Sequence, residues 1–387
     1  MTDTPRRVAL RRVTLTAVTG LGLCLTLLPA GQAQAQAQAP ARVPCNDVAA
    51  LRTAIGNANT DGGTIALAPH CVYTLTAADN PDDGLPEITG KVRITGNNTT
   101  IQRAQFAPAF RIFHVGQGGS LSLDSLTVRG GQAPPAPLLA SNGGAVYNDR
   151  GRVALTDTTV RNNSSSWLGG GIWNSRGTLV LRNTTVRDNT SENAGGVATN
   201  GTMTMRGGAL RDNTGTLWAG GLANAGDTTL TDVSVDGNHI GGQSGSFLHL
   251  GGGIMTMQID DESGPLRLNA TRVRGNIAQG QGGGILIGAD EPTTLYRSVV
   301  TRNAANGGPG SGGGIYNSSS RFGLFTNPVA GPERTSSNSA KQTAEVNLIR
   351  SAVFKNTPDN CAPPNSVPRC DAVGSAPATN TPEPGRN

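Results

Sequence analysis

Gly169-Gly170-Gly171-Ile172, followed by Val186-x-x-Asn189, is the stretch that decides the fold, because the chain repeats it many times. Each copy has a glycine pair or triplet ending in Ile, Leu or Val, and later a Val or Leu three residues before an Asn. The residues that end the glycine runs include Val146, Ile172, Val197 and Leu222, which are 26, 25 and 25 residues apart. This period is typical of a solenoid, in which each coil buries its apolar residues against its neighbours.

Strand periodicity lies between the two halves of each repeat. Leu179 and Leu181 alternate with polar or outward positions, and Val186 follows Leu181 after five residues, a step that requires a turn. We therefore predict three short strands per coil, at Gly-Gly-Gly-Ile, at Leu-x-Leu, and around the Val before Asn. No helical period fits inside a coil. The pattern predicts an all-β, right-handed parallel β-helix, a single-stranded solenoid of about ten coils over residues 63–360.

Composition agrees with narrow coils. The 387 residues include 54 glycines, and aromatic residues make up only 4%. Glycine reaches positive φ at tight corners without steric cost, and Asn tolerates that region better than most residues. Stacked asparagines can also pair their amides along the coils. We therefore interpret the repeated Gly and Asn residues as structural, and we expect an Asn ladder that includes Asn189 and Asn213.

Residues 1–39 have the pattern of an export signal. Four arginines among residues 6–12 precede a short apolar run at 13–29, and Gln-Ala repeats then supply small-residue cleavage sites. We interpret these residues as a signal for ordinary secretion, and export by the twin-arginine route is the alternative. Removal would take away four Arg and one Asp and lower the formal net charge from +5 to +2. That charge gives no support for nucleic-acid binding, and we expect a secreted monomer without an integral membrane segment.

Four cysteines remain after removal of the signal: Cys45, Cys71, Cys361 and Cys370. An even number in an exported chain favours disulfides. Since the two pairs lie at opposite ends of a long solenoid, we predict Cys45–Cys71 and Cys361–Cys370. A metal site is the alternative, but no Cys-x-x-Cys or His spacing supports it.

The ends of the solenoid need caps, because an open end exposes apolar core and a strand edge. Residues 46–59 carry the one helical pattern, with Val48, Leu51 and Ile55 on one face and Asn46 or Asp47 as the N-cap. We predict an N-terminal cap over residues 40–62. Residues 361–387 are expected to form a disulfide-closed end and a disordered tail.

Several stretches resemble secreted bacterial right-handed β-helix repeat proteins of the pectin-lyase-like group. They are Asp47-Val48-Ala49-Ala50-Leu51, Gly63-Thr64-Ile65, Ile94-Thr95-Gly96-Asn97, Phe110-Arg111-Ile112-Phe113 and Gly118-Gly119-Ser120-Leu121-Ser122-Leu123. The glycine tetrapeptides are similar to those of chlamydial polymorphic outer-membrane proteins, which have Phe where this chain has Val or Leu. The first resemblance implies a fold that often carries polysaccharide lyases and hydrolases, with Asp clusters beside Arg or Lys and sometimes calcium.

The catalytic motifs implied by that resemblance are missing from the sequence. Asn-Thr-Asp, Asp-Asp, Gly-His-Gly and Arg-Ile-Lys in polygalacturonase-like arrangement are not found, and Asp157 and Asp232 share a column about three coils apart, too far for paired acid–base work. Two acidic runs could bind Ca²⁺ or could be solvated loops. They are Asp79, Asp82 and Asp83, and Asp260, Asp261 and Glu262. We predict no catalytic residues and no required cofactor, and the metal content stays unknown.

Insertions gather in one corner, between the Asn and the next glycine run, and this corner often marks the binding side of a solenoid. Trp167, Trp218 and Phe247 fall there, while Tyr147 and Trp173 take equivalent positions on neighbouring coils. These rings could pack on sugars or on one another. A further excursion at 318–345 is long and polar, and we expect it to be disordered.

One outward column is rich in arginine. The residue after each strand-ending Val or Leu must point outward, and this column reads Arg129, Arg161, Arg187, Arg211, Asp236, Arg274, Thr301 and Phe354. Either Asp188 and Asp212 neutralise it, or the guanidinium groups bind a linear polyanion such as a uronate chain. We predict a secreted, non-catalytic binding or envelope-associated protein that recognises an acidic polysaccharide or envelope glycan. The alternative is a polysaccharide lyase or glycoside hydrolase with an unrecognised site.

Overall fold

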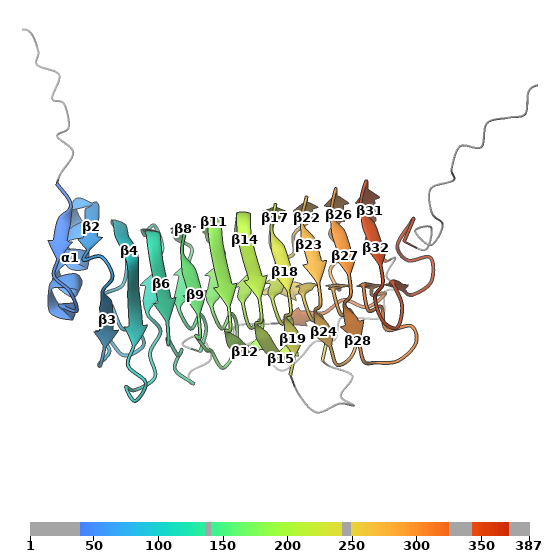
Figure 1. Ribbon diagram of the computed structural model, residues 1–387, viewed down its shortest axis with the longest axis horizontal. Coiled ribbons are helices and arrows are strands. Elements are labelled where there is room, and N and C mark those ends of the chain that lie inside the picture. Colours follow the sequence, from blue (N-terminus) through green and yellow to red (C-terminus); the bar gives the residue numbers. More distant parts are fainter. Residues whose placement is uncertain (1–38, 136–140, 242–248, 325–342, 371–387) are drawn as a thin grey trace, which may run out of the picture. The chain divides into compact units, whose positions relative to one another are not determined.

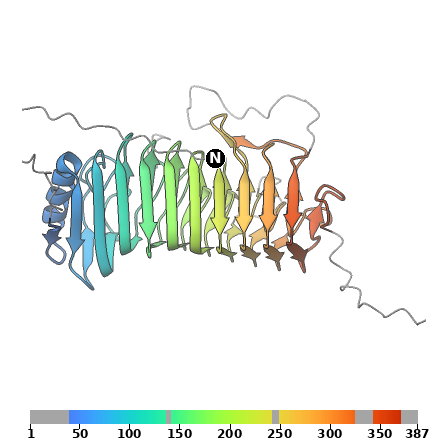
Figure 2. The same cartoon turned by 90° about the horizontal axis from the view of Figure 1, so that it is seen from above.

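The computed structural model describes residues 39–135, 141–241, 249–324 and 343–370. In this part of the chain the protein is a right-handed parallel β-helix, as predicted, and every strand pair in the sheets is parallel. Successive coils follow one another in sequence order (Figures 1 and 2). Residues 1–38 of the predicted signal and residues 371–387 of the predicted tail lie outside the described residues.

The Gly-Gly repeats form the first sheet, as predicted, because their terminal Ile, Leu or Val residues stack in register: Val146 pairs with Ile172, and Ile172 with Val197. This nine-stranded sheet comprises β5 (Phe113–Val115), β7 (Val146–Asp149), β10 (Ile172–Ser175), β13 (Val197–Thr199), β16 (Leu222–Asn224), β20 (Ile254–Thr256), β25 (Ile285–Ile287), β29 (Ile315–Asn317) and β33 (Cys361–Ala362).

The Leu-x-Leu and Val segments belong to one sheet. They are two separate strands, as predicted, in coils such as that of β8 (Arg152–Thr156) and β9 (Thr159–Arg161), but in other coils one unbroken strand contains both. In β11, for example, one strand runs through both segments, and Asn183 makes the expected turn as a kink with φ 47°. The seventeen strands are β1 (Ala41–Val43), β2 (Gly63–Leu67), β3 (Val72–Leu75), β4 (Lys91–Arg103), β6 (Ser120–Arg129), β8 (Arg152–Thr156), β9 (Thr159–Arg161), β11 (Thr178–Arg187), β14 (Thr202–Arg211), β17 (Thr228–Thr231), β18 (Ser234–Asp236), β22 (Leu266–Asn269), β23 (Arg272–Arg274), β26 (Thr293–Tyr296), β27 (Val299–Thr301), β31 (Val346–Ile349) and β32 (Ala352–Phe354).

A third sheet occupies the position directly after each Asn, where the sequence predicted only a corner. Its five short strands are β12 (Thr190–Asn193), β15 (Thr214–Trp218), β19 (His239–Ile240), β24 (Ile277–Ala278) and β28 (Ala304–Ala305). These strands lack a shared apolar pattern, so no periodicity in the sequence indicates them. Their backbone groups pair because the Asn residues before them are already held in register (Figure 1).

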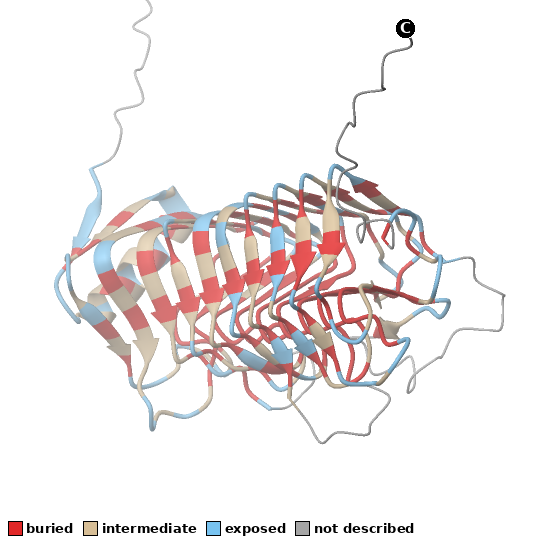
Figure 3. Cartoon of the chain, turned by 45° about the vertical axis from the view of Figure 1, so that its right-hand side comes forward, coloured by how far each residue is buried: buried red, intermediate tan, exposed pale blue. Residues whose placement is uncertain are grey.

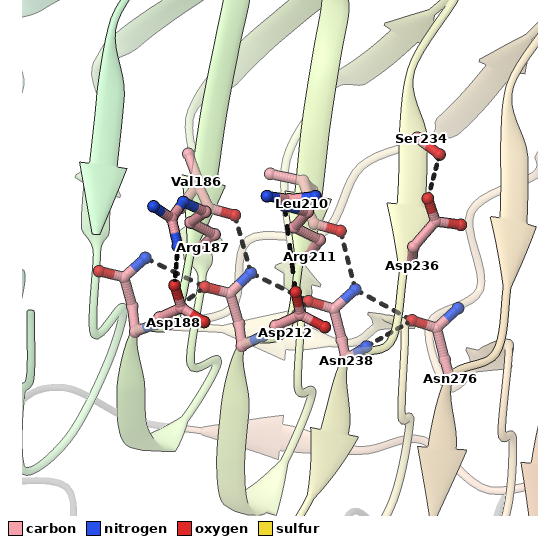
Figure 4. Close-up of polar contacts among 12 residues, drawn as sticks. Val186, Arg187, Asp188, Leu210, Arg211, Asp212, Ser234, Asp236, Asn238 and Asn276 are labelled. Carbon is pink, nitrogen blue, oxygen red and sulfur yellow. Dashed lines mark hydrogen bonds and ion pairs between the residues drawn. The ribbon is translucent and has the colours of Figure 1, made fainter. Parts of the chain in front are cut away.

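The interior of the coils holds one continuous apolar core, in which Leu179, Leu181 and Val186 are fully buried. Buried and more exposed residues alternate along the strands (Figure 3), as a sheet with one inward face requires. The asparagines line the corner of this core as the predicted ladder: Asn189 Nδ2 donates to Asn213 Oδ1 at 3.0 Å, and Asn213 Nδ2 to Asn238 Oδ1 at 2.9 Å (Figure 4).

The N-terminal cap contains the predicted helix, α1 (Val48–Asp61), and one strand that was not predicted, β1. Asp47 is the N-cap and accepts a hydrogen bond from the Ala50 N–H, while Gly62 ends the helix. Leu51 and Ile55 are buried over the first coil. β1 pairs with β2 and so covers the first strand edge.

Both predicted disulfides are present: Cys45–Cys71, with Cα atoms 5.6 Å apart, and Cys361–Cys370, with Cα atoms 6.2 Å apart. Disulfides favour an oxidising environment. Among the described residues, no helix is long and apolar enough to cross a membrane.

A second apolar cluster lies outside the coils, on the outer face of the nine-stranded sheet. It contains Trp173, Met255 and Leu286, and β21 (Gln258–Ile259) and β30 (Gly323–Leu324) cover part of it. The pairing of these two strands corrects the expectation of disorder for the start of the excursion at 318–345. Residues 325–342 of that excursion lie outside the described part, as do residues 242–248, which include Phe247.

Candidate functional site

The arginine column is present on the outer face of the seventeen-stranded sheet. Arg129 pairs with Arg161, Arg161 with Arg187, and Arg187 with Arg211, on the neighbouring strands β6, β9, β11 and β14. The preceding residue in each strand is fully buried, so the arginine side chains point outward. The column then continues in register through Asp236, Arg274, Thr301 and Phe354. Neighbouring strands are about 4.8 Å apart, which places these like charges close together.

Arg187 and Arg211, the third and fourth arginines of the column, are neutralised locally. Arg187 Nη1 contacts the carboxylate of Asp188, and Arg211 Nε lies 4.0 Å from Asp212 Oδ2 (Figure 4). Both aspartates have positive φ, 54° and 53°, which turns the chain at the strand end and brings each carboxylate back to its neighbour. This half of the column therefore matches the self-neutralised alternative.

The two earlier arginines lack this compensation, because Gly130 and Asn162 occupy the positions of the aspartates. Among the described residues, neither Arg129 nor Arg161 forms an ion pair. Arg161 Nη1 donates to Asn162 Oδ1 at 2.9 Å, a neutral acceptor. Arg129 is half-buried, and its Nε has no hydrogen-bond partner within the described residues. A half-buried guanidinium group without a carboxylate partner can still form charge-assisted hydrogen bonds with an anion.

The surroundings of Arg161 lower its pKa. Burial is the largest cause that lowers the pKa of Arg161, and the positive charges of Arg129 and Arg187 lower it further, while Asp188 opposes them. The guanidinium stays charged at neutral pH. A bound anion would relieve the repulsion that this arrangement creates.

Hydroxyl groups form the adjacent outward column. Thr127, Thr159 and Thr185 precede the arginines by two residues and pair with one another in register. Since residues two apart on a strand share a face, each arginine lies beside a threonine. The surface formed by Arg129, Arg161, Thr127 and Thr159, here called the arginine–threonine face, offers guanidinium groups for carboxylates and hydroxyls for sugar oxygens.

The predicted aromatic residues pack into the protein instead of forming a sugar platform. Trp218 has only 8% of its surface exposed and lies in the outer apolar cluster, 6.5 Å from Phe322 between ring centroids. Trp167 is half-buried and packs against the same cluster. Tyr147 and Trp173 are in register on neighbouring strands, as predicted. Only 1% of the Trp173 surface is exposed, so its ring is not available to a sugar. We therefore remove Trp167 and Trp218 from the ligand-binding set.

A charged cluster that the sequence analysis missed lies in the N-terminal coils. Arg111, 2% exposed, has its Nε 2.6 Å from Asp83 Oδ1, and its guanidinium carbon lies 5.1 Å from the centre of the Tyr147 ring. His114 Nδ1 lies 3.5 Å from Asp83 Oδ2, and the His114 ring stacks on Tyr147 at 4.8 Å. Burial raises the pKa of Tyr147 to about 12. Arg111 and Asp83 are both buried and pair with each other, so neither charge is buried alone.

Several carboxylates of the two acidic runs form ion pairs. Asp83 is paired with Arg111, Asp79 with Arg52 at 3.4 Å, and Glu262 with Arg176 at 3.6 Å. Over the described residues, no group of three or more His, Cys, Asp or Glu side chains is arranged to hold a metal ion. Carboxylates are the usual ligands for calcium, and basic side chains contact Asp79, Asp83 and Glu262.

Comparison with known proteins assigns the chain to no family, because no family model and no curated protein matches it. Among solved structures it is similar to pectate lyase Pel9A, with a TM-score of 0.41 and 16% identity over 79% of this chain and 74% of that one. It is also similar to the A-module of the Azotobacter vinelandii mannuronan C-5 epimerase AlgE6, with a TM-score of 0.32 and 14% identity over 83% and 96% of the chains. Likeness at this level carries no conclusion about activity, and no match supports the chlamydial repeat resemblance.

Proposed function

We propose that this protein is an exported, non-catalytic β-helix binding protein that recognises an acidic polysaccharide through the arginine–threonine face. The observation that carries the proposal is the pair Arg129 and Arg161, which are in register on neighbouring strands without a carboxylate partner. The planar guanidinium fork suits the carboxylates of uronate chains, and a point charge would match them less well.

Within the arginine column, the expected binding site is the part formed by Arg129 and Arg161. Arg187 and Arg211 already hold Asp188 and Asp212, so a ligand carboxylate would have to displace an existing partner there. At Arg129 and Arg161 it would displace no carboxylate, because the acceptor next to Arg161 is the neutral amide oxygen of Asn162. A polymer lying across the coils therefore gains most of its binding energy at these two residues, and its hydroxyls meet Thr127 and Thr159.

Retention on immobilised polygalacturonate, alginate and anionic wall polymers at low salt tests this proposal. We expect the wild type to be retained and to elute as salt rises, because exposed charges are screened. The double variant Arg129→Ala/Arg161→Ala should bind roughly a hundredfold more weakly or worse, since charge-assisted hydrogen bonds contribute about 1.5–3 kcal/mol each.

Two matched variants remove the same charge elsewhere. Arg182→Ala/Arg206→Ala alters two exposed arginines that are also in register on β11 and β14, and it should leave binding nearly unchanged. Arg187→Ala/Arg211→Ala should have a small effect. Equal losses in all three variants would indicate general charge attraction, and no retention of the wild type on any polymer would reject the proposal. Release of reducing sugar or unsaturated uronate during the assay would favour the enzyme alternative.

A further inference from the structure

An open cavity of about 370 Å³ lies on a different edge of the coils, where three successive turns lead from the nine-stranded sheet into the seventeen-stranded sheet. The turns contribute residues 176–178, 200–202 and 225–227, and the segment after β21 contributes Glu262 and Ser263. Because that segment joins the coil only in the folded protein, no single repeat contains the cavity.

The floor of the cavity is backbone. A Cβ atom on Gly201 would lie 2.3 Å from Gly177 O, and one on Gly226 would lie 1.9 Å from Gly201 O, so only glycine lets these turns stack. Gly177, Gly201 and Gly226 therefore line the cavity with backbone, and side chains line it only at the walls.

One wall is held in place by an ion pair across the cavity. Arg176 Nε lies 3.6 Å from Glu262 Oε1, and Arg176 Nη2 donates to Asp260 O at 3.5 Å. The segment itself is anchored by Ile259, which is fully buried in the outer cluster, and by the pairing of β21 with β30. This anchoring keeps Glu262 at the cavity although it lies in an insertion.

The lining is polar and electrically balanced. Glu262 is paired with Arg176, and the second carboxylate, Asp227, is paired with Arg267. No aromatic side chain lines the cavity, and Ala225 is its one apolar side chain. An anion would meet two carboxylates here, and a cation would find both carboxylates already paired, so the lining favours an uncharged ligand.

An unused donor points to the kind of ligand. Asn200, 5% exposed, accepts a hydrogen bond from the Arg176 N–H through Oδ1 at 2.8 Å, but its Nδ2 has no partner among the described residues. A buried amide donor without a partner costs free energy, which a ligand acceptor would recover.

We infer that this cavity binds a neutral, hydroxyl-rich ring, namely a single unit of an uncharged sugar. Asn200 Nδ2 donates to a ring hydroxyl, and the carboxylates of Glu262 and Asp227 accept hydrogen bonds from others. Its volume falls within the range of small-molecule sites. The site is distinct from the arginine–threonine face and does not depend on the function proposed for that face.

Saturation-transfer NMR on the full chain tests the inference, with glucose, galactose, mannose and N-acetylglucosamine as neutral probes and galacturonate as the charged probe. We expect at least one neutral sugar to bind and galacturonate to bind more weakly. The conservative change Glu262→Gln should weaken the neutral sugar roughly tenfold, because one charge-assisted hydrogen bond is lost. It also frees Arg176, so galacturonate should gain relative to the neutral sugar.

A second variant and a control complete the test. Asn200→Ala should abolish the neutral-sugar signal, and if that variant fails to fold, Glu262→Gln decides alone, because Glu262 is half exposed. Glu345→Gln, at an exposed position outside the cavity, should bind as the wild type does. No signal from any neutral sugar, stronger binding of galacturonate to the wild type, or an unchanged affinity in Glu262→Gln would each overturn the inference.

Discussion

Each asparagine inside the ladder has all of its amide hydrogen-bonding groups satisfied. Asn213 Nδ2 donates to Val186 O at 3.0 Å and to Asn238 Oδ1, and its Oδ1 accepts from both the Nδ2 and the backbone N–H of Asn189. Asn213 is fully buried. A buried amide in such a network stabilises the structure because removing it leaves several neighbours without partners.

Replacing Asn213 with Leu should therefore lower the free energy of unfolding by about 1–3 kcal/mol, the cost of unsatisfied buried polar groups. The denaturant midpoint and the melting temperature measure this loss. Asn269→Leu is the matched control, because Asn269 lies at the outward end of β22 and takes no part in the ladder. An Asn213→Leu protein as stable as the control would contradict a structural role for the ladder.

Tyr147 links stability to alkaline pH. Burial is the main cause that raises its pKa from 10.0 to about 12, and Asp149 adds to the rise, whereas Arg111 and Arg150 oppose it. Because the folded protein holds this proton more tightly than the unfolded chain, the stabilisation is complete below pH 10 and is lost as pH rises toward 12.

Denaturant titrations on both sides of pH 10 should show this decline, and Tyr147→Phe should make it shallower because the titrating group is gone. Tyr296→Phe, at the end of β26, serves as the matched change. If the slope between pH 10 and 12 is the same in Tyr147→Phe and the wild type, Tyr147 is not the source of the decline.

At the scale of elements, the two ends of the solenoid are closed differently. The first disulfide joins β1 and α1 to the first coil across 26 residues of sequence, whereas the second closes a loop of 9 residues. A cross-link that closes the longer loop removes more conformational entropy from the unfolded chain. The N-terminal cap also carries the helix that covers the core.

The variant Cys45→Ser/Cys71→Ser should therefore lose about 3–4 kcal/mol of stability, and Cys361→Ser/Cys370→Ser about 2–3 kcal/mol, by the loop-closure relation. Thermal unfolding of the two variants beside the wild type measures the difference. A larger loss at the C-terminal pair would show that loop entropy does not control the stability of these ends.

Strand boundaries were less predictable than strand positions. The sequence placed apolar residues in the correct columns, but β11 and β14 each run unbroken through a turn that was expected to separate two strands. In β14 two glycines, Gly207 and Gly208, take the positive φ values of that turn, 66° and 83°. A kink of this kind preserves ladder pairing on both sides, and periodicity alone cannot distinguish it from a break.

At the scale of the whole molecule, the repeat carries most of the information about the coils. Each coil buries the same positions against the same neighbours, so a periodic sequence specifies the interior, the register of the arginine column and the Asn ladder. A one-residue slip would turn every apolar side chain outward, which makes the register firm.

Features built by insertions required the tertiary structure. The pairing of β21 with β30, the covering of Trp218, and the cluster of Asp83, Arg111 and His114 all join segments without a shared repeat. The repeat period does not predict which inserted segments contact one another, because these contacts depend on the rigid surface that the coils provide.

The sequence by itself thus determined the β-helix, its cap helix, its cysteine pairs and the outward arginine column, because these follow from local periodicity and from position along a one-dimensional stack. The residue that follows each arginine already indicates which of them is compensated, whereas only the tertiary structure brought Arg176 of one turn to Glu262 of a later insertion. That contact joins residues far apart in the sequence, and no repeated pattern encodes it.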